Sequence, residues 1–552
     1  MNQKHKANNE EHPERIYETR SAKDIANKKE EFNKIVGYYL DNKPSLMLDR
    51  KSHELEIRFG TNPKLSRPIS KIDYDNVVKQ IKTCGFVSEV EAGTQLLRIQ
   101  TEYMHPETGR TTMSNIRAEI VGTDLIQEYC RTNNIQKVID MPSMLSNKIK
   151  FTHKVTAKHK NGDWINKVNM DDYNFRVSYQ TEQDYNVYSN SVKSIISNWT
   201  DVKKRFRNLN RVRFSHPDYP VFVDVSIIKS AKTVKGIHVP TYTVQEANLF
   251  NNNETYEIEL EVDNTKVGTG TQYATTESLM IPIRKCIRIV LSGLQGTNYP
   301  ISYLERENIL QSYMKLLHGD EHPNKWVSYK DFIGPSSTTL QVENIVEPVD
   351  GSANPNIRKD YTVTEKADGD RMLLYISKDG KIYMIDSNMN VIFTGAKTKE
   401  KTVFNSLLDG EHIKIDKNGN NINVYAAFDI YYVNNKSVRE YPFLKTDDVE
   451  EENAKLEEGE IPPNNYRMSL MNEVIELLKP TSILDNVDES ATKSVGITIK
   501  SKSFYSDTTH GTIFAACSHK LSEIKDGLFE YNTDGLIFTP SKFPAGGDMV
   551  MV

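Results

Sequence analysis

The sequence predicts an α+β protein whose first domain is an antiparallel β-barrel with flanking helices and whose second domain mixes strands and helices. Three observations predict this fold class. The chain has 552 residues, which is too long for a single hydrophobic core. From about residue 31 to 265, short segments of alternating apolar and polar residues are separated by Asn, Gly, Asp and Pro, as is typical of strands. Several of these segments carry charges on one face only, which favours a barrel with a polar interior.

The composition is that of an ordinary globular protein. Hydrophobic residues make up 38% and charged residues 26% of the chain, and the formal net charge is −5. If the chain binds nucleic acid, its basic groups must therefore be gathered locally. No apolar run is long enough to cross a membrane, and the first thirty residues are too polar for a signal peptide. The 4 cysteines lie far apart, which argues against a disulfide framework and a cysteine-type zinc site and fits a reducing compartment.

Patterning divides the chain into four parts. Residues 1–30 are rich in Lys, Glu and Asn, and we expect a disordered or loosely attached arm there. Residues 31–318 are expected to form the first domain, closed by helices in 274–317, where apolar residues recur at helical spacing. A turn-rich junction is expected at 319–345, and the second domain at 346–552.

Two strands of the first domain carry carboxylates at alternating positions. In "HELEIRFG" (53–60) and "YEIELEVD" (256–263), acidic residues share one face and apolar residues share the other. One such strand alone is better explained as a surface strand with its acids in water. Two of them in one domain weaken that explanation, because like charges that face a closed interior repel each other unless cations neutralise them. Hard divalent cations prefer such oxygen ligands.

Basic strands lie between the two acidic ones. The segments "NKIKFTHKVT", "NFRVSYQTE" and "RVRFSH" place Lys and Arg side chains on one face, and "FVDVSII" contributes Asp224. A barrel built from these strands would hold a metal ion on its acids and a polyphosphate on its bases. The metal polarises a phosphoryl oxygen and orients water, while the Arg and Lys side chains take up developing charge.

The E-x-E-x-R strand followed by the E-x-E-x-E strand resembles those of the tunnel-type, metal-dependent RNA triphosphatases. The resemblance implies that the first domain is a triphosphate tunnel. It implies metal ligands at Glu54, Glu56, Glu257 and Glu259, with Glu261 as a further candidate. It also implies triphosphate contacts from Arg58, Lys150, Arg176, Arg211 and Arg213, with Asp224 supporting the basic residues.

A second constellation begins at "TEKADGDR" (364–371). A protonated lysine is a poor nucleophile, and it becomes useful when it is desolvated or placed among other cations. Here Lys366 precedes Asp368, then Gly369, which allows a close backbone approach, and then Arg371, which could grip a phosphate. Taken alone, the pattern is equally consistent with a charged turn that leads into a strand.

Four later segments accompany this motif: "LLDGEH", "AAFDIYYV", "IKSKSFY" and "TDGLIFTP". Each alone has a plain explanation as a turn or a strand. In this order they resemble the nucleotidyltransferase superfamily of mRNA guanylyltransferases and ATP-dependent ligases, in which Lys366 would attack the α-phosphate of a nucleotide and form a lysyl-NMP. The resemblance implies phosphate contacts from Arg371 and Lys502, ribose or metal contacts from Glu411 and Asp534, base stacking on Phe428, and further nucleotide contacts from Asp368, Gly369 and Lys500.

Together the two domains resemble the bifunctional mRNA-capping enzymes of large DNA viruses, over roughly residues 40–540. Glu365, directly before the lysine, favours the capping branch over the ligases. The implied activities are consecutive: hydrolysis of an RNA 5′-triphosphate to the diphosphate, then transfer of GMP from GTP. The resemblance further implies Mg²⁺ or Mn²⁺ as cofactor, with 5′-triphosphate RNA, GTP and a methyltransferase domain or subunit as partners. It implies no membrane, and a place in the host cytoplasm, a virus factory or the virion.

Two alternatives stay open at this point. One is an ATP-dependent polynucleotide ligase joined to an end-processing domain, and the other is a non-catalytic RNA-binding subunit that has kept both folds. In the superfamily, a strand with paired lysines and an OB-fold lid follow the "DGLIFTP" motif. This sequence stops at "SKFPAGGDMVMV", so we expect a second domain that lacks its C-terminal lid, in a chain that is a fragment or is completed by another chain.

Overall fold

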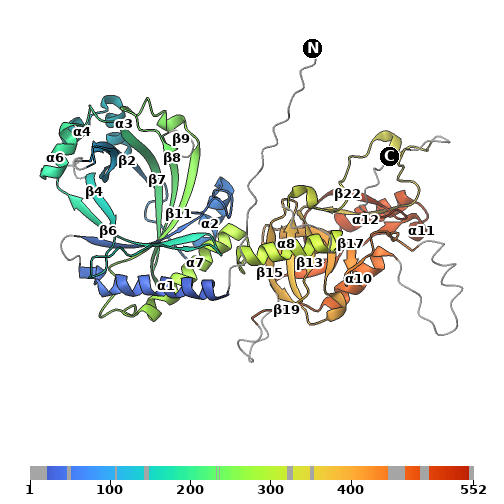
Figure 1. Ribbon diagram of the computed structural model, residues 1–552. Coiled ribbons are helices and arrows are strands. Elements are labelled where there is room, and N and C mark those ends of the chain that lie inside the picture. The colour runs from blue at the N-terminus through green and yellow to red at the C-terminus, as the bar shows by residue number, and fades with distance from the viewer. Residues whose placement is uncertain are drawn as a thin grey trace, which may run out of the picture. The chain divides into compact units, whose positions relative to one another are not determined.

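A computed structural model gives the fold. It describes residues 22–46, 51–105, 108–141, 148–231, 233–234, 237–319, 327–348, 354–445, 466–484 and 496–545. The chain forms two compact units, Met1–Gly296 and Thr297–Val552, and each is described by itself (Figure 1). None of the helices in the described ranges combines the length and the apolar character that a membrane crossing requires. All four cysteines are free thiols.

The first unit is built on a nine-stranded antiparallel sheet. Its strands pair in the order β1-β11-β8-β7-β2-β3-β4-β6-β5, and β1 also pairs with β6. That last pairing closes eight strands into a ring and leaves β5 as an extension beside β6. The predicted antiparallel barrel is therefore confirmed. The strands are β1 (Ser52–Phe59), β2 (Thr94–Met104), β3 (Thr111–Val121), β4 (Ile149–Thr156), β5 (Val168–Met170), β6 (Phe175–Tyr185), β7 (Lys204–His216), β8 (Tyr219–Ser230) and β11 (Glu254–Val262).

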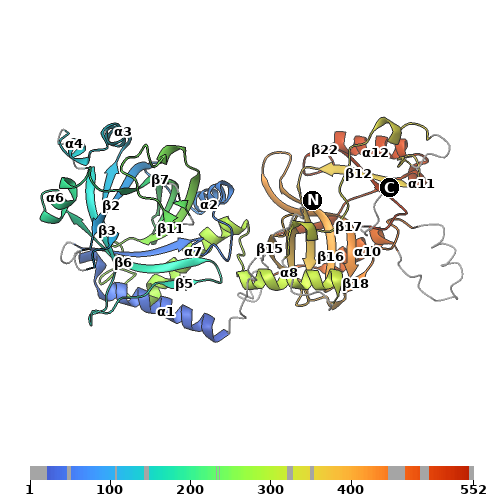
Figure 2. The ribbon, with the colours of Figure 1, turned by 45° about the horizontal axis from the view of Figure 1, so that its top comes forward.

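Helices cover the outer surface of the barrel, as the sequence predicts (Figure 2). One group packs against the outward side chains of β1, β6, β8 and β11, and it comprises α1 (Ala22–Asp41), α2 (Lys71–Thr83) and α7 (Thr276–Gln295). A second group packs against β2, β3, β4 and β7, and it comprises α3 (Thr123–Thr132), α4 (Ile135–Ile139) and α6 (Asn190–Ser197). Smaller elements complete the unit: η1 (Pro44–Leu46), β9 (Thr233–Val234), β10 (Ile237–His238) and η3 (Leu249–Asn251). The two large hydrophobic cores of this unit thus lie outside the barrel wall. A small apolar cluster of Leu96, Leu209 and Ile228 lies on the inward face, in line with the interior arginines of the same strands, and polar side chains line much of the rest of the interior.

The second unit contains an eight-stranded sheet and a three-stranded sheet. The larger runs β18-β17-β16-β13-β14-β15-β19, with β20 pairing β17 in parallel, and the smaller runs β21-β12-β22. The strands are β12 (Tyr361–Ala367), β13 (Asp370–Ile376), β14 (Lys381–Asp386), β15 (Val391–Lys397), β16 (Ser406–Ile415), β17 (Asn421–Val433), β18 (Lys436–Ser437), β19 (Thr481–Ser482), β20 (Thr498–Ser501), β21 (Tyr505–Ser506) and β22 (Thr533–Pro540). The helical elements are α8 (Tyr303–His318), α10 (Arg467–Leu478), α11 (Asp507–His510), α12 (Ile513–Lys525), η4 (Tyr329–Asp331), η5 (Val342–Asn344) and η6 (Lys401–Val403).

Two predicted boundaries are wrong. The expected arm lies at 1–30, but α1 already begins at Ala22, and residues 1–21 lie outside the described residues. We also expected both helices of 274–317 to close the first domain. Only α7 does so, because the apolar face of α8 packs into the second unit, with Tyr313 and Met314 in one core cluster with Leu373. Both helices are amphipathic, and periodicity does not say which sheet a helix covers.

A close helix crossing gives the first testable prediction. A Cβ at Gly293 of α7 would lie 2.7 Å from the Cα of Val77 in α2, so Gly293→Ala forces the two helices apart. We expect a loss of about 1 to 3 kcal/mol in the free energy of unfolding, measured by denaturant titration. Gly37→Ala in α1 is the matched control, because its Cβ would meet its nearest neighbour at 3.4 Å and alanine favours the helix. Equal stability of both variants would contradict the close contact between α2 and α7 at Gly293.

Candidate active sites

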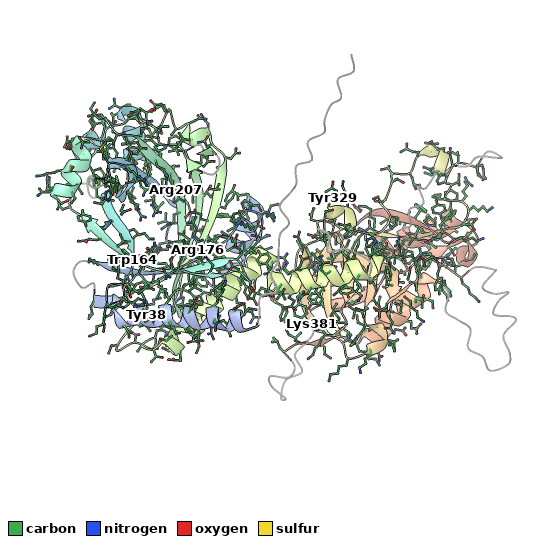
Figure 3. All side chains as sticks on the ribbon, in the orientation of Figure 1. Tyr38, Trp164, Arg176, Arg207, Tyr329 and Lys381 are labelled. Carbon is green, nitrogen blue, oxygen red and sulfur yellow. The ribbon has the colours of Figure 1, made fainter. Side chains whose placement is uncertain are left out.

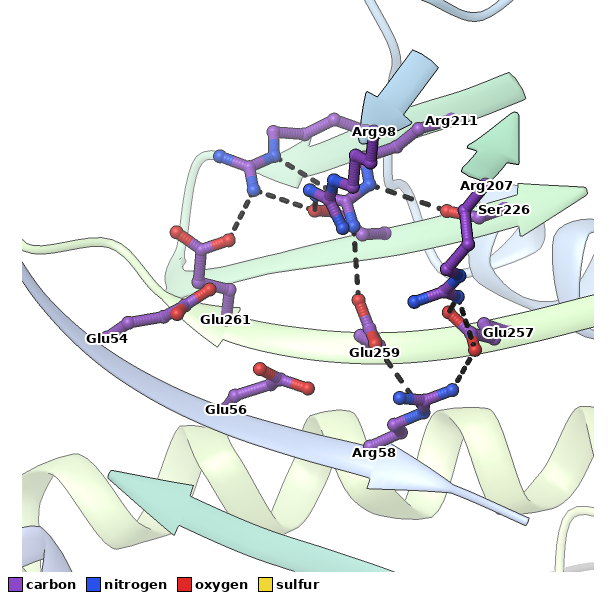
Figure 4. Close-up of polar contacts among 12 residues, drawn as sticks. Glu54, Glu56, Arg58, Arg98, Arg207, Arg211, Ser226, Glu257, Glu259 and Glu261 are labelled. Carbon is purple, nitrogen blue, oxygen red and sulfur yellow. Dashed lines mark hydrogen bonds and ion pairs between the residues drawn. The ribbon is translucent and has the colours of Figure 1, made fainter. Parts of the chain in front are cut away.

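The acidic residues of the first unit gather inside the barrel because their two strands are neighbours. In β1, Leu55 and Ile57 are fully buried under the outer helices, so Glu54, Glu56 and Arg58 point inward. The same alternation places Glu257, Glu259 and Glu261 of β11 inward. The register pairs Glu56 with Glu261 and Arg58 with Glu259 across the two strands. Figure 4 shows these side chains facing one another between the strands.

The chain's own cations neutralise this acidic cluster. Lys154 of β4 pairs with Glu54, lies 3.2 Å from a carboxylate oxygen of Glu56, and lies 3.6 Å from one of Glu182. Arg58 pairs with Glu257 and lies 3.6 Å from Glu259. The acids are thus held by lysine and arginine side chains, and among the described residues no group of three or more His, Cys, Asp or Glu forms a ready metal site.

The predicted basic residues of β7 lie opposite the acids. Arg213 makes a two-pronged contact with Asp224, at 2.8 and 2.7 Å, and also pairs with Glu261. Arg211 lies 3.3 Å from both Asp224 and Glu259. Asp224 is 2% exposed, so it is the buried anchor that orients both guanidinium groups, in the position expected of a supporting residue.

The other two predicted triphosphate contacts lie away from this cluster. Arg176 donates from Nε to Asn169 of β5 at 2.9 Å, at the edge where the sheet extends beyond the ring. Lys150 is half exposed, and its nearest acidic partner is Asp184, 3.8 Å away. Lys154, four residues further along β4, is the lysine that reaches the glutamates.

Sequence reasoning missed several interior residues. Arg207 of β7 donates to both carboxylate oxygens of Glu257, at 2.9 and 3.0 Å. A further cluster joins β2 and β3, where Glu119 lies 2.9 Å from Arg98 and 2.7 Å from Arg117. The alternating arginines of "RFRNLNRVRF" carry the signal for Arg207. Arg98 and Glu119 face each other only through the pairing of β2 with β3, which sequence alone does not give.

Burial and crowding shift the titration of the glutamates. Burial raises the pKa of Glu54 to about 7, although the positive charge of Lys154 acts to lower it. The negative charges of the neighbouring carboxylates also act to raise this pKa: Glu182, Glu56 and Glu261. Burial also raises the pKa of Glu261 although Arg213 opposes the shift. For Glu56 burial acts in the same direction, but Lys154 and Arg58 outweigh it and hold the pKa of this carboxyl below its ordinary value. Burial thus favours the protonated form at Glu54 and Glu261, whereas Lys154 and Arg58 favour the carboxylate at Glu56. The all-oxygen donor set of the cluster fits a hard divalent cation.

The predicted nucleophile of the second unit lies at the end of β12. Lys366 pairs with Asp534 of β22, with Nζ 2.7 and 2.6 Å from the two carboxylate oxygens. The hydrogen bond from Asp534, and then its charge and those of Glu411 and Asp368, raise the pKa of this lysine. This environment favours the protonated form of Lys366. Asp368 is exposed in the turn that follows.

Gly369 is required by the packing of the turn that follows Lys366. A Cβ at this position would lie 3.1 Å from the carbonyl oxygen of His412 and 3.3 Å from the Cβ of Glu411. The turn between β12 and β13 therefore presses against β16. This contact holds the lysine strand next to the strand that carries Glu411.

Arg371 is held in place by a buried carboxylate that the sequence did not single out. Asp409 of β16 is fully buried, accepts from Arg371 Nε at 3.1 Å, and accepts from the Tyr431 hydroxyl at 2.6 Å. The guanidinium lies 5.8 Å from the ring centre of Phe428. Arg371 and the predicted base-stacking residue are thus neighbours, on the side of the sheet that Glu411 shares.

Among the described residues of this unit, four buried side-chain atoms lack hydrogen-bond partners, and two of them belong to predicted site residues: Oε2 of Glu411 and Nζ of Lys502. Lys502 is 1% exposed and lies 3.7 Å from Glu365 Oε1, beyond hydrogen-bond distance. Burial lowers its pKa and raises that of Glu411. An unpaired buried donor beside an unpaired buried acceptor is costly, and such groups are typical of a site that completes its contacts with a ligand.

Lys500 and Lys502 do not share a role. Lys500 is on the surface, pairs with Glu530 and lies 5.1 Å from the ring centre of Tyr531. Lys502 belongs to a buried network around Glu365, which the Tyr531 hydroxyl and Lys520 also reach. Glu365 therefore fixes β12 directly behind the nucleophile.

The titration of Glu54 yields a prediction for unfolding experiments. A carboxyl with a folded pKa near 7 and an unfolded pKa near 4.5 holds an extra proton in the folded state between those values. Its contribution to stability is complete below pH 4.5 and is lost as the pH rises to 7. In metal-free buffer we expect Glu54→Gln to gain about 1 to 3 kcal/mol relative to the wild type between pH 5 and 7.5. Denaturant titrations at several pH values measure this, and a constant difference would contradict it.

Comparisons with known proteins follow the division into two units. Residues 353–457 match the family described as "mRNA capping enzyme, catalytic domain". A curated relative, the probable mRNA-capping enzyme of Acanthamoeba polyphaga mimivirus, is 25% identical over 307 residues, which cover 52% of this chain and 23% of that protein. The chain thus spans about a quarter of the length of this relative.

Among solved structures, the S. pombe Pct1 RNA triphosphatase matches 48% of this chain and 92% of its own, with 11% identity and a TM-score of 0.26. Within the residues matched by the family lie six of the nine residues of the nucleotide site predicted from the sequence: Lys366, Asp368, Gly369, Arg371, Glu411 and Phe428. The predicted resemblance to the mRNA-capping enzymes of large DNA viruses is thereby confirmed as a similarity, which rests on the family match at residues 353–457 and on the viral relative.

Proposed function

We propose that this chain performs two consecutive steps of mRNA cap formation. The barrel hydrolyses the 5′-triphosphate of RNA to a diphosphate with the help of Mg²⁺ or Mn²⁺, and the second unit transfers GMP from GTP to that diphosphate through Lys366. The observation that carries the proposal is the match of the capping-enzyme catalytic domain around Lys366, in a chain whose other unit is a closed barrel lined with acids and bases.

In the barrel, the interior ion pairs indicate how a triphosphate with its metal ion would bind. Arg58, Arg211 and Arg213 are each held by carboxylates, and those carboxylates are the proposed metal ligands. A triphosphate with its metal ion offers both partners at once: phosphate oxygens for the cations and the metal for the glutamates. Binding therefore exchanges ion-pair partners without leaving a buried charge alone, which would be costly. When bound, the metal polarises the phosphoryl group and orients the attacking water.

In the second unit, Lys366 must first lose a proton. Asp534 accepts two contacts from its ammonium and is the nearest base. The neutral amine then attacks the α-phosphorus of GTP, a P–N bond forms, and pyrophosphate leaves. In the second half-reaction, an oxygen of the RNA diphosphate attacks the same phosphorus and the lysine is released. Arg371 and Lys502 supply positive charge to the phosphates, and the free Oε2 of Glu411 is available to a metal ion or the ribose.

The barrel activity is tested with two glutamates of one strand. Glu259→Gln removes an interior carboxylate, and we expect phosphate release from 5′-triphosphate RNA to fall by roughly 100-fold or more, because a metal ligand is lost. Glu254→Gln, at the exposed start of β11, is the matched control and should retain activity. Chelation of divalent cations should abolish release in every variant. Full activity of Glu259→Gln, or activity without metal, would refute this half of the proposal.

The transferase activity is tested by covalent labelling. The wild type should retain label from α-labelled GTP in the presence of Mg²⁺ or Mn²⁺, and Lys366→Ala should retain none, because no other amine replaces the nucleophile. Lys378→Ala, at an exposed hairpin of the same unit, is the control. Label retained from ATP but not from GTP would instead support a polynucleotide ligase. No label from either nucleotide, with RNA still bound, would support a non-catalytic RNA-binding subunit.

A further inference from the structure

A hairpin at 157–165 continues the barrel wall beyond β4. The amide of Ala157 donates to Tyr179 of β6, so pairing with the barrel persists past the end of the strand. Ile165 then donates back to Ala157 at 2.9 Å, and His159 donates to Asp163 at 2.8 Å. The turn is closed at Gly162, whose φ of +94° favours glycine. The hairpin is therefore a regular part of the wall.

The two faces of this hairpin differ. Ala157 and Ile165 are buried in the core under α1, and the His159 ring packs edge-on against Tyr38 of that helix, 4.5 Å between centroids. Side chains alternate along paired strands, so the bridged residues Lys158 and Trp164 lie on the opposite face. That is the face from which Lys154 reaches the interior glutamates. Figure 3 labels Tyr38, Trp164 and Arg176.

Trp164 is an unusual residue for a solvent-facing position. Its side chain is 53% exposed, and Lys158 Nζ lies 4.1 Å from the centre of its ring. The same face continues to Asn169 and Arg176, which hydrogen-bond across β5 and β6. Arg176 is in register with Arg58 of β1, which contacts the interior glutamates. A continuous polar and aromatic surface thus runs from the glutamate cluster out to the hairpin.

The chemistry of this surface fits single-stranded nucleic acid. A tryptophan ring offers a stacking partner to any base, and neighbouring Lys and Arg side chains attract the phosphate backbone. Lys160 and Lys167, both exposed, add charge of the same sign, and the acidic side chain of the turn, Asp163, accepts a hydrogen bond from Asn161. Lys158 lies four residues beyond Lys154, or about 13 Å along a strand. This distance leaves room for one or two nucleotides between the barrel interior and the indole ring of Trp164.

We propose that Lys158, Trp164, Asn169 and Arg176 form a platform for the first nucleotides of a single-stranded RNA whose 5′ end lies in the barrel. The inference rests on the proposed function, because it takes the barrel to receive an RNA 5′ end. It adds a preference that phosphate contacts alone cannot supply. The interior side chains recognise phosphates of any triphosphate, whereas the platform recognises the nucleotides that follow and so favours RNA over free nucleoside triphosphates.

The test is direct binding of a short single-stranded 5′-triphosphate oligoribonucleotide to the full chain, measured by fluorescence anisotropy without divalent cations. We expect Trp164→Ala to weaken binding about 10-fold and Trp164→Phe to restore most of it, because phenylalanine still stacks. Tyr188→Ala is the control, since Tyr188 is 75% exposed but lies beyond β6, outside the platform. With divalent cation present, Trp164→Ala should raise the KM for RNA by a larger factor than the KM for a free nucleoside triphosphate.

Two outcomes overturn the platform. Unchanged RNA binding by Trp164→Ala would show that the exposed ring serves another purpose, such as contact with a protein. Equal effects on RNA and on free nucleoside triphosphate would show damage to the tunnel itself. The binding assay needs no turnover, so it separates this proposal from the proposed activity: Trp164-dependent binding, with no phosphate release once divalent cation is added, leaves the platform standing and refutes the hydrolysis.

Discussion

The ion pairs between Lys154 and the glutamates of β1 are the constraint on which the first unit depends. A ring of eight strands closes only if its interior can be filled, and here charged side chains fill much of it while the two large hydrophobic cores lie outside the wall and a small apolar cluster at Leu96, Leu209 and Ile228 faces inward. Six interior glutamates or more at such spacing would repel strongly unless cations stood between them. Lys154 contacts three of them: Glu182, its partner on the neighbouring strand β6, and Glu54 and Glu56 on β1, the next strand of the ring, so it links β4 electrostatically to β1 across β6. The barrel can therefore close only if the charges in its interior are balanced.

The same balance prepares the barrel for its proposed chemistry. Asp224 is buried and fixes Arg213, so that guanidinium loses little freedom when it binds a phosphate. Burial raises the pKa values of Glu54 and Glu261 although Lys154 and Arg213 oppose the shift, so keeping these carboxylates ionised in the empty barrel costs free energy. A bound hard divalent cation would stabilise their ionised form. Stability of the empty barrel and affinity for metal are thus opposed, as is common where a site is built for a ligand.

The second unit uses buried carboxylates in a comparable way. Asp409 fixes Arg371, and Glu365, on the nucleophile strand itself, lies 3.7 Å from Lys502. Both carboxylates are fully buried. Lys366 itself is half exposed and pairs with Asp534. The proposed nucleophile is therefore accessible, while buried charges set the orientation of its neighbours, an arrangement that favours precise positioning at low reorganisation cost.

The sequence by itself determined which residues carry charge inward. The alternation in "HELEIRFG" and "YEIELEVD" assigns faces correctly, because a strand has a period of two and its apolar face must be buried. The motif around Lys366 was equally local. Tertiary structure alone decided the partners: Lys154 rather than Lys150 reaches the glutamates, Asp409 holds Arg371, and α8 packs on the second unit. These contacts depend on which strands are neighbours and on which oppositely charged side chains the fold brings together. No local sequence pattern encodes such long-range contacts.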